Sequence, residues 1–319
     1  MNNNDIQVSV CIVTYNQESY IAECLDSIIN QQTNFKFEVI IGEDCSTDNT
    51  RVIVQDYIEK YPNLIVPIFY EKNVGPVENI KRVYKKAKGK YIAHIDGDDL
   101  ALPNKLQTQF EILESNLDCN VCSHDMKRSN KNGRFKIGSW QYPEGKYDLF
   151  SLYMKLPFFA HSSKMFRNKY ASTFWDNLLS KSYILDIDIH VANLEDGDIY
   201  HIGKPFGIYR VGSGTSCKGE KVNNILPLGL ERVFEKGLVI YQKDEVKLAA
   251  IKELYSLAML QCAYLYAIYD KDSSLYKLYV NKSFKQGSAG IKQKVFKLGT
   301  FFPSTFFILC SFRKKIREL

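Results

Sequence analysis

Residues 91–99 constrain the fold more than any other part of the sequence. They read Tyr-Ile-Ala-His-Ile-Asp-Gly-Asp-Asp, a short apolar run that ends abruptly in three carboxylates. Ile92, Ala93 and Ile95 predict a strand that is buried on both faces of a parallel sheet. Gly97 then allows a sharp turn, because glycine has no Cβ atom. The chain must bury this strand and still keep its acidic end out of the apolar core.

The three acidic residues are Asp96, Asp98 and Asp99, and their negative charges repel one another at this spacing. They either point into water, as in an ordinary solvated turn, or surround a cation. Open α/β sheets bind ligands outside the carboxyl ends of their strands. The position directly after a buried strand therefore favours a cation or ligand site.

Three strand–helix units precede this acidic strand. From the spacing of apolar residues, we expect strands at 8–14, 37–41 and 64–70, and helices at 18–31, 52–61 and 77–87. Ser46 or Thr47 is expected to cap the second helix, and Gly89 to cap the end of the third. Repeated β–α units predict a parallel sheet with right-handed crossovers.

The rest of the chain is less regular up to about residue 222 and helical after it. We expect a helix at 103–115, strands at 120–123, 199–202 and 206–210, a helix at 184–195 and a flexible loop at 212–216. Residues 126–180 are rich in aromatic side chains and have poor periodicity. The predicted fold class is α/β, with a mostly parallel central sheet flanked by helices over 1–222 and a helical C-terminal appendage over 223–319.

Composition excludes some functions. The net charge of +6 comes from 42 basic and 36 acidic residues without a dense basic stripe, so nucleic-acid binding is not expected. The net charge is compatible with binding to an anionic ligand or a membrane surface.

Scattered cysteines and the lack of a basic, apolar leader favour a reduced, cytoplasmic compartment. Cys119 and Cys122 form a lone Cys-x-x-Cys pair, which we interpret as two small buried side chains rather than a metal or redox site.

The last segment of the sequence combines aromatic and basic residues. Between Phe296 and Arg317 an apolar run, too short and too interrupted to span a bilayer, is followed by four basic residues. Such a segment fits a peripheral anchor on an anionic membrane. The alternative is that Phe301, Phe302, Phe306 and Phe307 pack against a helix expected at 246–269. Pro303 should interrupt any single helix here.

Four segments of the first 110 residues carry a resemblance to a known family. They are the strand at 8–14 with its following loop, the acidic loop at 43–48, Asn73 with Gly75, and the turn at 96–99. In this order and spacing they resemble the inverting glycosyltransferases of family 2, of the bacterial surface-glycan type, which have the GT-A fold. Each segment alone is weak, because short acidic turns are common.

The resemblance implies a binding site for a nucleotide diphosphate sugar in residues 1–110 and an acceptor-binding half in residues 111–222. The residues that would hold the nucleotide are Thr14, Tyr15, Asn16, Glu43, Asp44, Asn73, Gly75, Asp96 and Gly97. The metal site would be Asp98, the direct ligand, with Asp96 and Asp99, and it would hold Mn²⁺ or Mg²⁺, since these cations prefer oxygen ligands. A UDP-sugar is the expected donor, by the family's habit.

The resemblance also implies a general base that takes the proton of the acceptor hydroxyl. In the family this is an aspartate at the head of a helix, and Asp186 matches it, with Asp188 as the second candidate. Both aspartates could instead simply favour a helix N-terminus. Without the Gln-x-x-Arg-Trp segment of processive synthases, we expect transfer of a single sugar to a glycan or lipid-linked glycan.

Three positions depart from the family's pattern. Cys45 stands where a glycine is usual, Glu43 where the first aspartate is usual, and Gly212 where a histidine often sits. These departures weaken the expected nucleotide contacts and remove one protein ligand from the later loop.

Two other enzyme or binding classes also use closely spaced aspartates. Haloacid dehalogenase-like phosphatases carry them on their first strand, followed by Thr or Val where this chain has Leu100. An EF-hand loop would need a glycine where Ala101 stands and a glutamate where Gln107 stands. A non-catalytic nucleotide-sugar or glycan-binding protein remains as the main alternative. The sequence does not address the oligomeric state.

Overall fold

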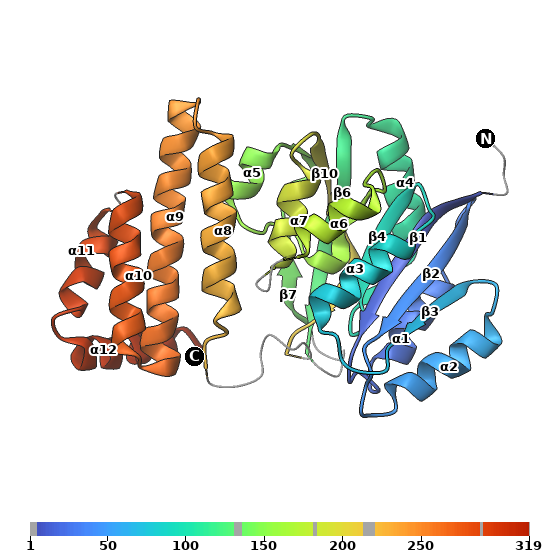
Figure 1. The fold of residues 1–319 in the computed structure, drawn as a ribbon, viewed down its shortest axis with the longest axis horizontal. Coiled ribbons are helices and arrows are strands. Elements are labelled where there is room, and N and C mark those ends of the chain that lie inside the picture. The colour runs from blue at the N-terminus through green and yellow to red at the C-terminus, as the bar shows by residue number, and fades with distance from the viewer. Residues whose placement is uncertain (1–4, 131–135, 181–183, 213–220, 288–289, 319) are drawn as a thin grey trace. The chain divides into compact units, whose positions relative to one another are not determined.

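The computed structural model describes residues 5–130, 136–180, 184–212, 221–287 and 290–318 of the chain. The chain divides into two compact units, Met1–Leu152 with Pro157–Cys217, and Tyr153–Leu156 with Lys218–Leu319 (Figure 1). The first unit contains a sheet and the second contains helices. The expected α/β class with a helical C-terminal part is confirmed. The expected division of the first unit into donor and acceptor halves stays a prediction.

All the described strands of the first unit belong to one sheet. Its main path has the order β3-β2-β1-β4-β9-β6-β10-β5, with β7 beside β6 and β8 beside β10. The strands are β1 (Ile6–Thr14), β2 (Lys36–Glu43), β3 (Ile65–Phe69), β4 (Tyr91–Asp96), β5 (Leu100–Ala101), β6 (Cys119–Ser129), β7 (Lys136–Trp140), β8 (Gly145–Tyr147), β9 (Met165–Arg167) and β10 (Asp198–Arg210).

The first four strands are parallel, as the repeated β–α units predict. The second half of the sheet is mixed, because the short β9 runs antiparallel to both β4 and β6. The strands expected at 199–202 and 206–210 are in fact one strand, β10. Its pairing with β6 shifts register between Ile202 and Pro205, where the proline has no N–H to donate.

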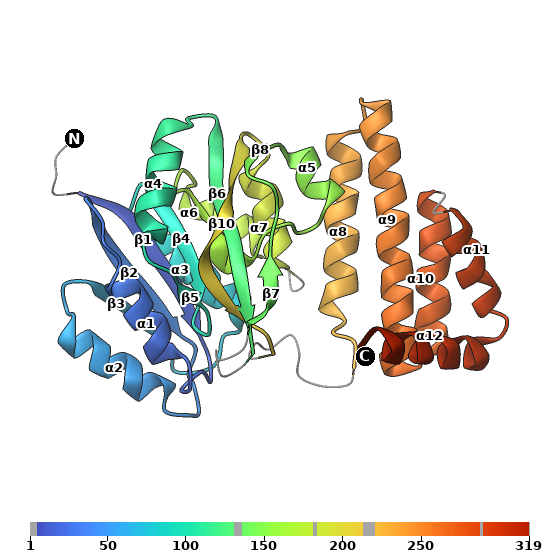
Figure 2. The same cartoon turned by 180° about the vertical axis from the view of Figure 1, so that it is seen from behind.

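Helices cover both faces of the sheet (Figures 1 and 2). One face of β1, β2 and β4 packs its apolar side chains against α1, α2 and α4, and the other faces α3 and α6. The helices of this part of the chain are α1 (Ile21–Ile29), α2 (Thr50–Lys60), α3 (Pro76–Lys86), α4 (Lys105–Ser115), α5 (Leu149–Met154), α6 (Ser172–Leu178) and α7 (Asp186–Asn193).

Two expected helix caps are wrong. Helix α2 has Asn49 as its N-cap, and Asp48 accepts hydrogen bonds from the N–H and hydroxyl of Thr50, so neither Ser46 nor Thr47 caps it. Helix α3 ends at Lys86, and its C-cap is Ala87, which has an extended conformation, rather than Gly89. Gly89 is needed for another reason, because a Cβ there would lie 2.5 Å from the backbone nitrogen of Ser9.

The described residues of the second unit form five helices and one π-helical turn. They are α8 (Ile225–Ile240), α9 (Glu245–Leu265), the turn Tyr266–Asp270, α10 (Ser273–Gln286), α11 (Gly290–Gly299) and α12 (Pro303–Glu318). Gln293 of α11 donates hydrogen bonds to Ser256 of α9 and Ser283 of α10, all buried. This polar contact ties three helices together inside an otherwise apolar core.

The C-terminal segment is partly buried. Phe307 is buried and its ring lies 5.3 Å from that of Tyr276 on α10, whereas Phe301 and Phe302 are 68% and 71% exposed. The alternative that all four phenylalanines pack against the helix at 246–269 is therefore wrong for Phe301 and Phe302. Pro303 begins α12, as expected for a helix interruption. None of the described helices is long and apolar enough to cross a membrane.

Candidate functional site

A cavity of about 420 Å³ lies in the first unit, at the carboxyl ends of β1, β2 and β4. The pairing of Thr14 with Glu43 and of Val13 with Asp96 brings the three strand ends to one level. The residues that line the cavity are Val13, Thr14, Tyr15, Gln17, Asp44, Asn73, Pro76, Asn79, Asp96, Asp98 and Tyr209. Six of the residues expected to bind nucleotide or metal thus line one cavity. The other five expected residues are not among its described lining residues: Asn16, Glu43, Gly75, Gly97 and Asp99.

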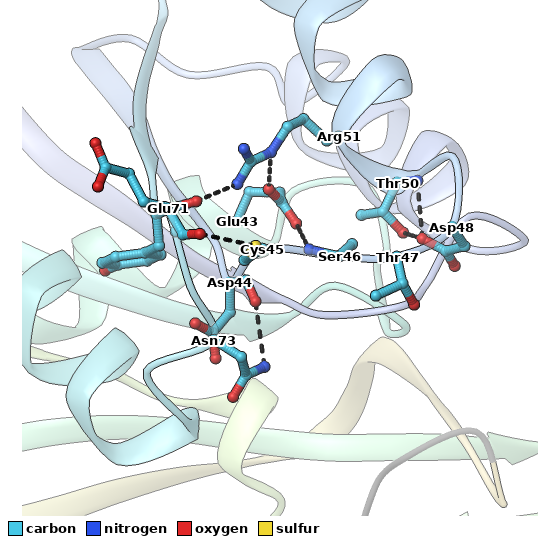
Figure 3. Close-up of polar contacts among 12 residues, drawn as sticks. Glu43, Asp44, Cys45, Ser46, Thr47, Asp48, Thr50, Arg51, Glu71 and Asn73 are labelled. Atoms are coloured by element: carbon cyan, nitrogen blue, oxygen red, sulfur yellow. Dashed lines mark hydrogen bonds and ion pairs between the residues drawn. The ribbon is translucent and has the colours of Figure 1, made fainter.

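Glu43 supports the acidic loop from the inside (Figure 3). Its fully buried carboxylate pairs with Arg51 and accepts a hydrogen bond of 2.6 Å from the Ser46 N–H. Arg51 in turn donates to the Tyr70 carbonyl at 2.6 Å. These contacts use the Glu43 side chain to fix the loop between β2 and α2.

Asp44 is the acidic residue of this loop that faces the cavity. Its carboxylate oxygens accept hydrogen bonds from the N–H groups of Val74 and Gly75, at 2.7 and 2.9 Å. Asn73 donates to the Asp44 carbonyl at 3.2 Å. Burial raises the pKa of Asp44, although the two backbone hydrogen bonds oppose the shift. Asp44 therefore joins the β2 loop to the start of α3.

Asn16 and Cys45 both have left-handed backbone conformations, with φ of 52° and 56°. The Asn16 side chain accepts a hydrogen bond of 2.8 Å from the Thr47 N–H, so it ties two loops together. Cys45 occupies a conformation that glycine adopts without steric cost, which explains why a glycine would be usual there.

The acidic turn after β4 separates its three aspartates. Asp96 and Asp98 line the cavity, whereas Asp99 is buried and accepts a hydrogen bond of 3.0 Å from the Arg210 N–H. The Arg210 guanidinium donates to the Asp98 carbonyl at 2.6 Å. Gly97 is packed tightly, because a Cβ there would lie 2.5 Å from Oε1 of Gln17.

Asp96 lies between the cavity and a buried group of basic side chains. Burial would raise its pKa, but hydrogen bonds from His94 and Ser162, both at 3.2 Å, hold the pKa below its usual value. Its side chain is 35% exposed. Asp96 can therefore stay ionised at the cavity wall.

The donor set of this turn fits a divalent cation at Asp98 and Asp96, because both offer hard carboxylate oxygens to the same cavity. Asp99 fits less well, since one of its oxygens is bonded to Arg210. Among the described residues, the three aspartates do not bring their ligand atoms within 4.8 Å of one another. A cation here would need oxygens from a bound diphosphate to complete its coordination.

Asp186 and Asp188 lie at the start of α7 and differ in their surroundings. Asp188 is buried and accepts a hydrogen bond of 2.9 Å from the Leu185 N–H, so it caps the helix. Asp186 is exposed, and it accepts one hydrogen bond of 2.8 Å from the Ile187 N–H. Desolvation by the surrounding protein raises the pKa of Asp186, and the nearby Lys164 lowers it in part.

Lys164 is a site residue that the sequence analysis missed. It is fully buried directly before β9, and its Nζ lies 3.4 Å from Nδ1 of His190 on α7. Burial lowers its pKa to about 7, while the charges of Asp186 and Asp96 act in the opposite direction. The only sequence signal near it is weak, because residues 159–166 mix apolar side chains with a histidine, two serines and Lys164 itself.

His161 and His190 complete this buried group. Burial lowers the pKa of each well below the usual value, so both rings are neutral. Neither ring nitrogen of His161 nor Nε2 of His190 has a hydrogen-bond partner among the described residues. Together with Asp186, these rings bring ligand atoms within 4.8 Å of one another.

The sequence matches the profile of glycosyl transferase family 2 over residues 9–175. It is 32% identical to an uncharacterized protein of Mycobacterium tuberculosis over 208 residues, which cover 64% of this chain and 58% of that protein. It is 30% identical to an uncharacterized glycosyltransferase of Methanocaldococcus jannaschii over 167 residues, 51% of this chain and 56% of that protein. The chain thus matches less than two thirds of these relatives' length.

The fold resembles that of S. aureus TarS 1–349. In its complex with UDP-GlcNAc, TarS matches 97% of this chain and 92% of its own, with a TM-score of 0.64 and 17% sequence identity. In its complex with UDP, the TM-score is 0.58 with 20% identity, over 92% of each chain. The match extends over the helical C-terminal unit as well as the sheet, and the expected GT-A fold is confirmed.

The buried Lys164 should make stability depend on pH. Its pKa of about 7 in the folded chain lies below the unfolded value of about 10.5, so the unfolded chain binds more protons between these values. Stability should therefore rise from pH 7 to pH 9. Replacement by methionine (Lys164→Met) should remove a part of this rise on the order of 1–2 kcal/mol. Urea unfolding at pH 7 and pH 9 measures the rise in the free energy of unfolding, with the exposed Lys88→Met variant as the control. If this rise is equal in the Lys164→Met and Lys88→Met variants, the lowered pKa of Lys164 is contradicted.

Proposed function

Because the chain belongs to glycosyl transferase family 2, we propose that it transfers one sugar from a UDP-sugar to a hydroxyl of a glycan or lipid-linked glycan, with inversion at the anomeric carbon. The main support is the cavity that Asp44, Asp96 and Asp98 share at the ends of three parallel strands. TarS, which has a similar fold, is described in complex with UDP-GlcNAc and with UDP. A protein that only binds the donor would not need a base such as Asp186.

In this proposal, the cavity binds the nucleotide part of the donor. Asp44, Thr14 and Tyr15 supply oxygens and a ring that can accept hydrogen bonds from a base and ribose and pack against them. Asn73 and Gly75 keep Asp44 in place through the loop that it binds. Asn16 and Glu43 act indirectly, by holding the two loops together.

Asp98, with Asp96 beside it, is proposed to hold Mn²⁺ or Mg²⁺ with the diphosphate. Such an ion would stabilise the negative charge that develops on the departing nucleotide diphosphate. Arg210 keeps the turn in position by binding the Asp98 carbonyl and, through its own N–H, the Asp99 carboxylate. Asp99 is thus proposed to support the turn rather than to bind the ion.

Asp186 is proposed as the general base, because Asp188 is already used to cap α7. Asp186 is accessible to solvent and hence to an acceptor, and its raised pKa makes it a better proton acceptor than an ordinary aspartate. Asp96 is hydrogen-bonded to His94 at 3.2 Å, the His94 ring lies 4.0 Å from that of His161, and ligand atoms of His161 and Asp186 lie within 4.8 Å of each other. This chain of contacts supports a role for both carboxylates in one reaction.

Replacing Asp98 by asparagine should abolish transfer and weaken UDP binding in the presence of Mn²⁺, because it removes a charged oxygen ligand. The fold should remain intact, since the Asp98 carbonyl, which the variant retains, accepts a hydrogen bond from the Arg210 guanidinium. Calorimetric titration with UDP, with and without Mn²⁺, and an assay for UDP release measure both effects. The exposed Asp56→Asn serves as the control. Unchanged binding and turnover in Asp98→Asn would disprove the metal assignment.

Replacing Asp186 by asparagine should lower turnover by about 10²- to 10⁴-fold, the usual contribution of a general base, and leave UDP affinity nearly unchanged. Asp188→Asn should retain turnover but lower stability, because it weakens the contact with the Leu185 N–H. Turnover, UDP affinity and urea unfolding should be measured for both variants. An inactive Asp188→Asn together with an active Asp186→Asn would reverse the roles.

The second unit is proposed to contact a membrane peripherally, so that the acceptor can be lipid-linked and the protein acts at the inner face. Its described C-terminal part exposes several large apolar side chains: Ile291, Val295, Leu298, Phe301, Phe302, Ile308 and Leu309. The sequence that follows contains Arg313, Lys314, Lys315 and Arg317. Exposed apolar groups with nearby cations fit the headgroup region of an anionic bilayer.

The double substitution Phe301→Ser and Phe302→Ser should reduce binding to anionic vesicles without loss of stability, because both rings are exposed. Sedimentation with vesicles containing phosphatidylglycerol measures binding, and its loss at high salt would show the part played by the basic residues. Leu117→Ser with Val246→Ser, at positions that are 78% and 81% exposed, is the matched control. A wild-type protein that ignores anionic vesicles would exclude this membrane contact.

A further inference from the structure

We propose that His161, Asp186 and His190 form a binding site for a transition-metal ion of the Zn²⁺ class, separate from the oxygen ligands at Asp98. Among the described residues, these three are the only ones whose His, Cys, Asp or Glu ligand atoms all lie within 4.8 Å of one another. Two imidazoles and one carboxylate are a common ligand set for Zn²⁺. A fourth position stays available for water or a bound molecule.

The two histidines are suited to bind a metal. Each ring has at least one nitrogen that is buried and unpartnered among the described residues, and a neutral imidazole offers a lone pair there. Lys164 lies beside Nδ1 of His190, which leaves Nε2 for the ion. Nε2 of His190 and both nitrogens of His161 are buried without a hydrogen-bond partner in the described part of the chain. Unpaired buried polar atoms cost free energy, and a bound ion would remove that cost.

Asp186 supplies the entry and the third ligand. It is the exposed member of the group, and its Oδ1 accepts the Ile187 N–H, so Oδ2 remains for a metal. Zn²⁺ binds nitrogen and oxygen at about 2.0–2.2 Å, which places neighbouring ligand atoms roughly 3.3–3.5 Å apart. The three residues would therefore have to move closer to bind the ion, and the exposed Asp186 carboxylate is free of the packing that holds the two rings.

The His161–Asp186–His190 site differs from the proposed donor cavity in the type of ligand atoms that it offers. Asp96 and Asp98 offer only oxygens and suit Mn²⁺ or Mg²⁺, whereas imidazole nitrogens favour Zn²⁺, Co²⁺ and Ni²⁺. Zn²⁺ bound to Asp186 also prevents that carboxylate from accepting a proton. Zn²⁺ is therefore a reversible inhibitor of transfer, a consequence that rests on the proposed role of Asp186, although binding of the ion does not.

Co²⁺ is the probe for this site, because its visible absorption is intense in a tetrahedral site and Zn²⁺ displaces it. The protein of residues 1–319 without a histidine tag, stripped of metal by a chelator, should bind one Co²⁺ per chain with this absorption. An excess of Mg²⁺ should not displace it. His161→Gln and His190→Gln should each weaken Co²⁺ binding at least tenfold, and Lys164→Met should tighten it by removing the nearest positive charge.

His201→Gln is the matched control, because both ring nitrogens of His201 are already hydrogen-bonded, to Ser123 at 2.7 Å and Asp125 at 2.9 Å. Cys45→Ser controls for a thiolate ligand, since Cys45 is the one described cysteine that is not buried. Circular dichroism and the melting temperature without metal identify any variant that fails to fold.

Three results would overturn the proposal. The first is that the wild-type protein lacks the tetrahedral Co²⁺ spectrum. The second is that the His161→Gln and His190→Gln variants fold and bind Co²⁺ with unchanged affinity. The third is that the protein shows thiolate-to-cobalt absorption that Cys45→Ser removes. Binding is measured without donor or acceptor, so its outcome is separate from that of the transfer assay. A protein that binds Co²⁺ in this way but transfers no sugar would contradict the proposed function and leave the metal site standing.

Discussion

The in-register parallel pairing of β1 with β2 and β4 is the constraint on which the candidate site depends. It places Thr14 beside Glu43 and Val13 beside Asp96, so the loops that follow three separate strands begin at the same level. A shift of one residue in either pairing would turn each buried side chain to the opposite face. Such a shift would move Val10 and Ile12 out of the apolar core, and this cost protects the geometry of the acidic loops.

Several charged side chains are buried in the first unit. Glu43, Asp99 and Lys164 are all removed from water, which is unfavourable unless a partner compensates. Glu43 has Arg51, and Asp99 has the Arg210 N–H, but Lys164 has a neutral histidine beside it and acidic groups only further away. Its lowered pKa is the expected response of a buried amine to such surroundings.

Much of the first 115 residues could be predicted from the sequence, because apolar periodicity determines strands and helices when both faces of a sheet are covered. The acidic turn at Asp96 and Asp98 was predictable for the same reason. The caps of α2 and α3 could not be predicted in this way. Ser46, Thr47 and Gly89 are residue types that commonly cap helices, but here they make tertiary contacts instead. The group around Lys164 could not be predicted from the sequence, because His161 is far from Asp186 and His190 along the chain. Only the packing of α7 near β9 brings these residues together.

Asp44 has a consequence for the thermodynamics of ligand binding. Each of its two carboxylate oxygens accepts one backbone N–H, and each has a second lone pair that can accept another hydrogen bond. A ligand can therefore bind to Asp44 without releasing the 73–75 loop, and the loop is already ordered before the ligand arrives. Little conformational entropy is lost on association, so more of the interaction energy is retained as affinity.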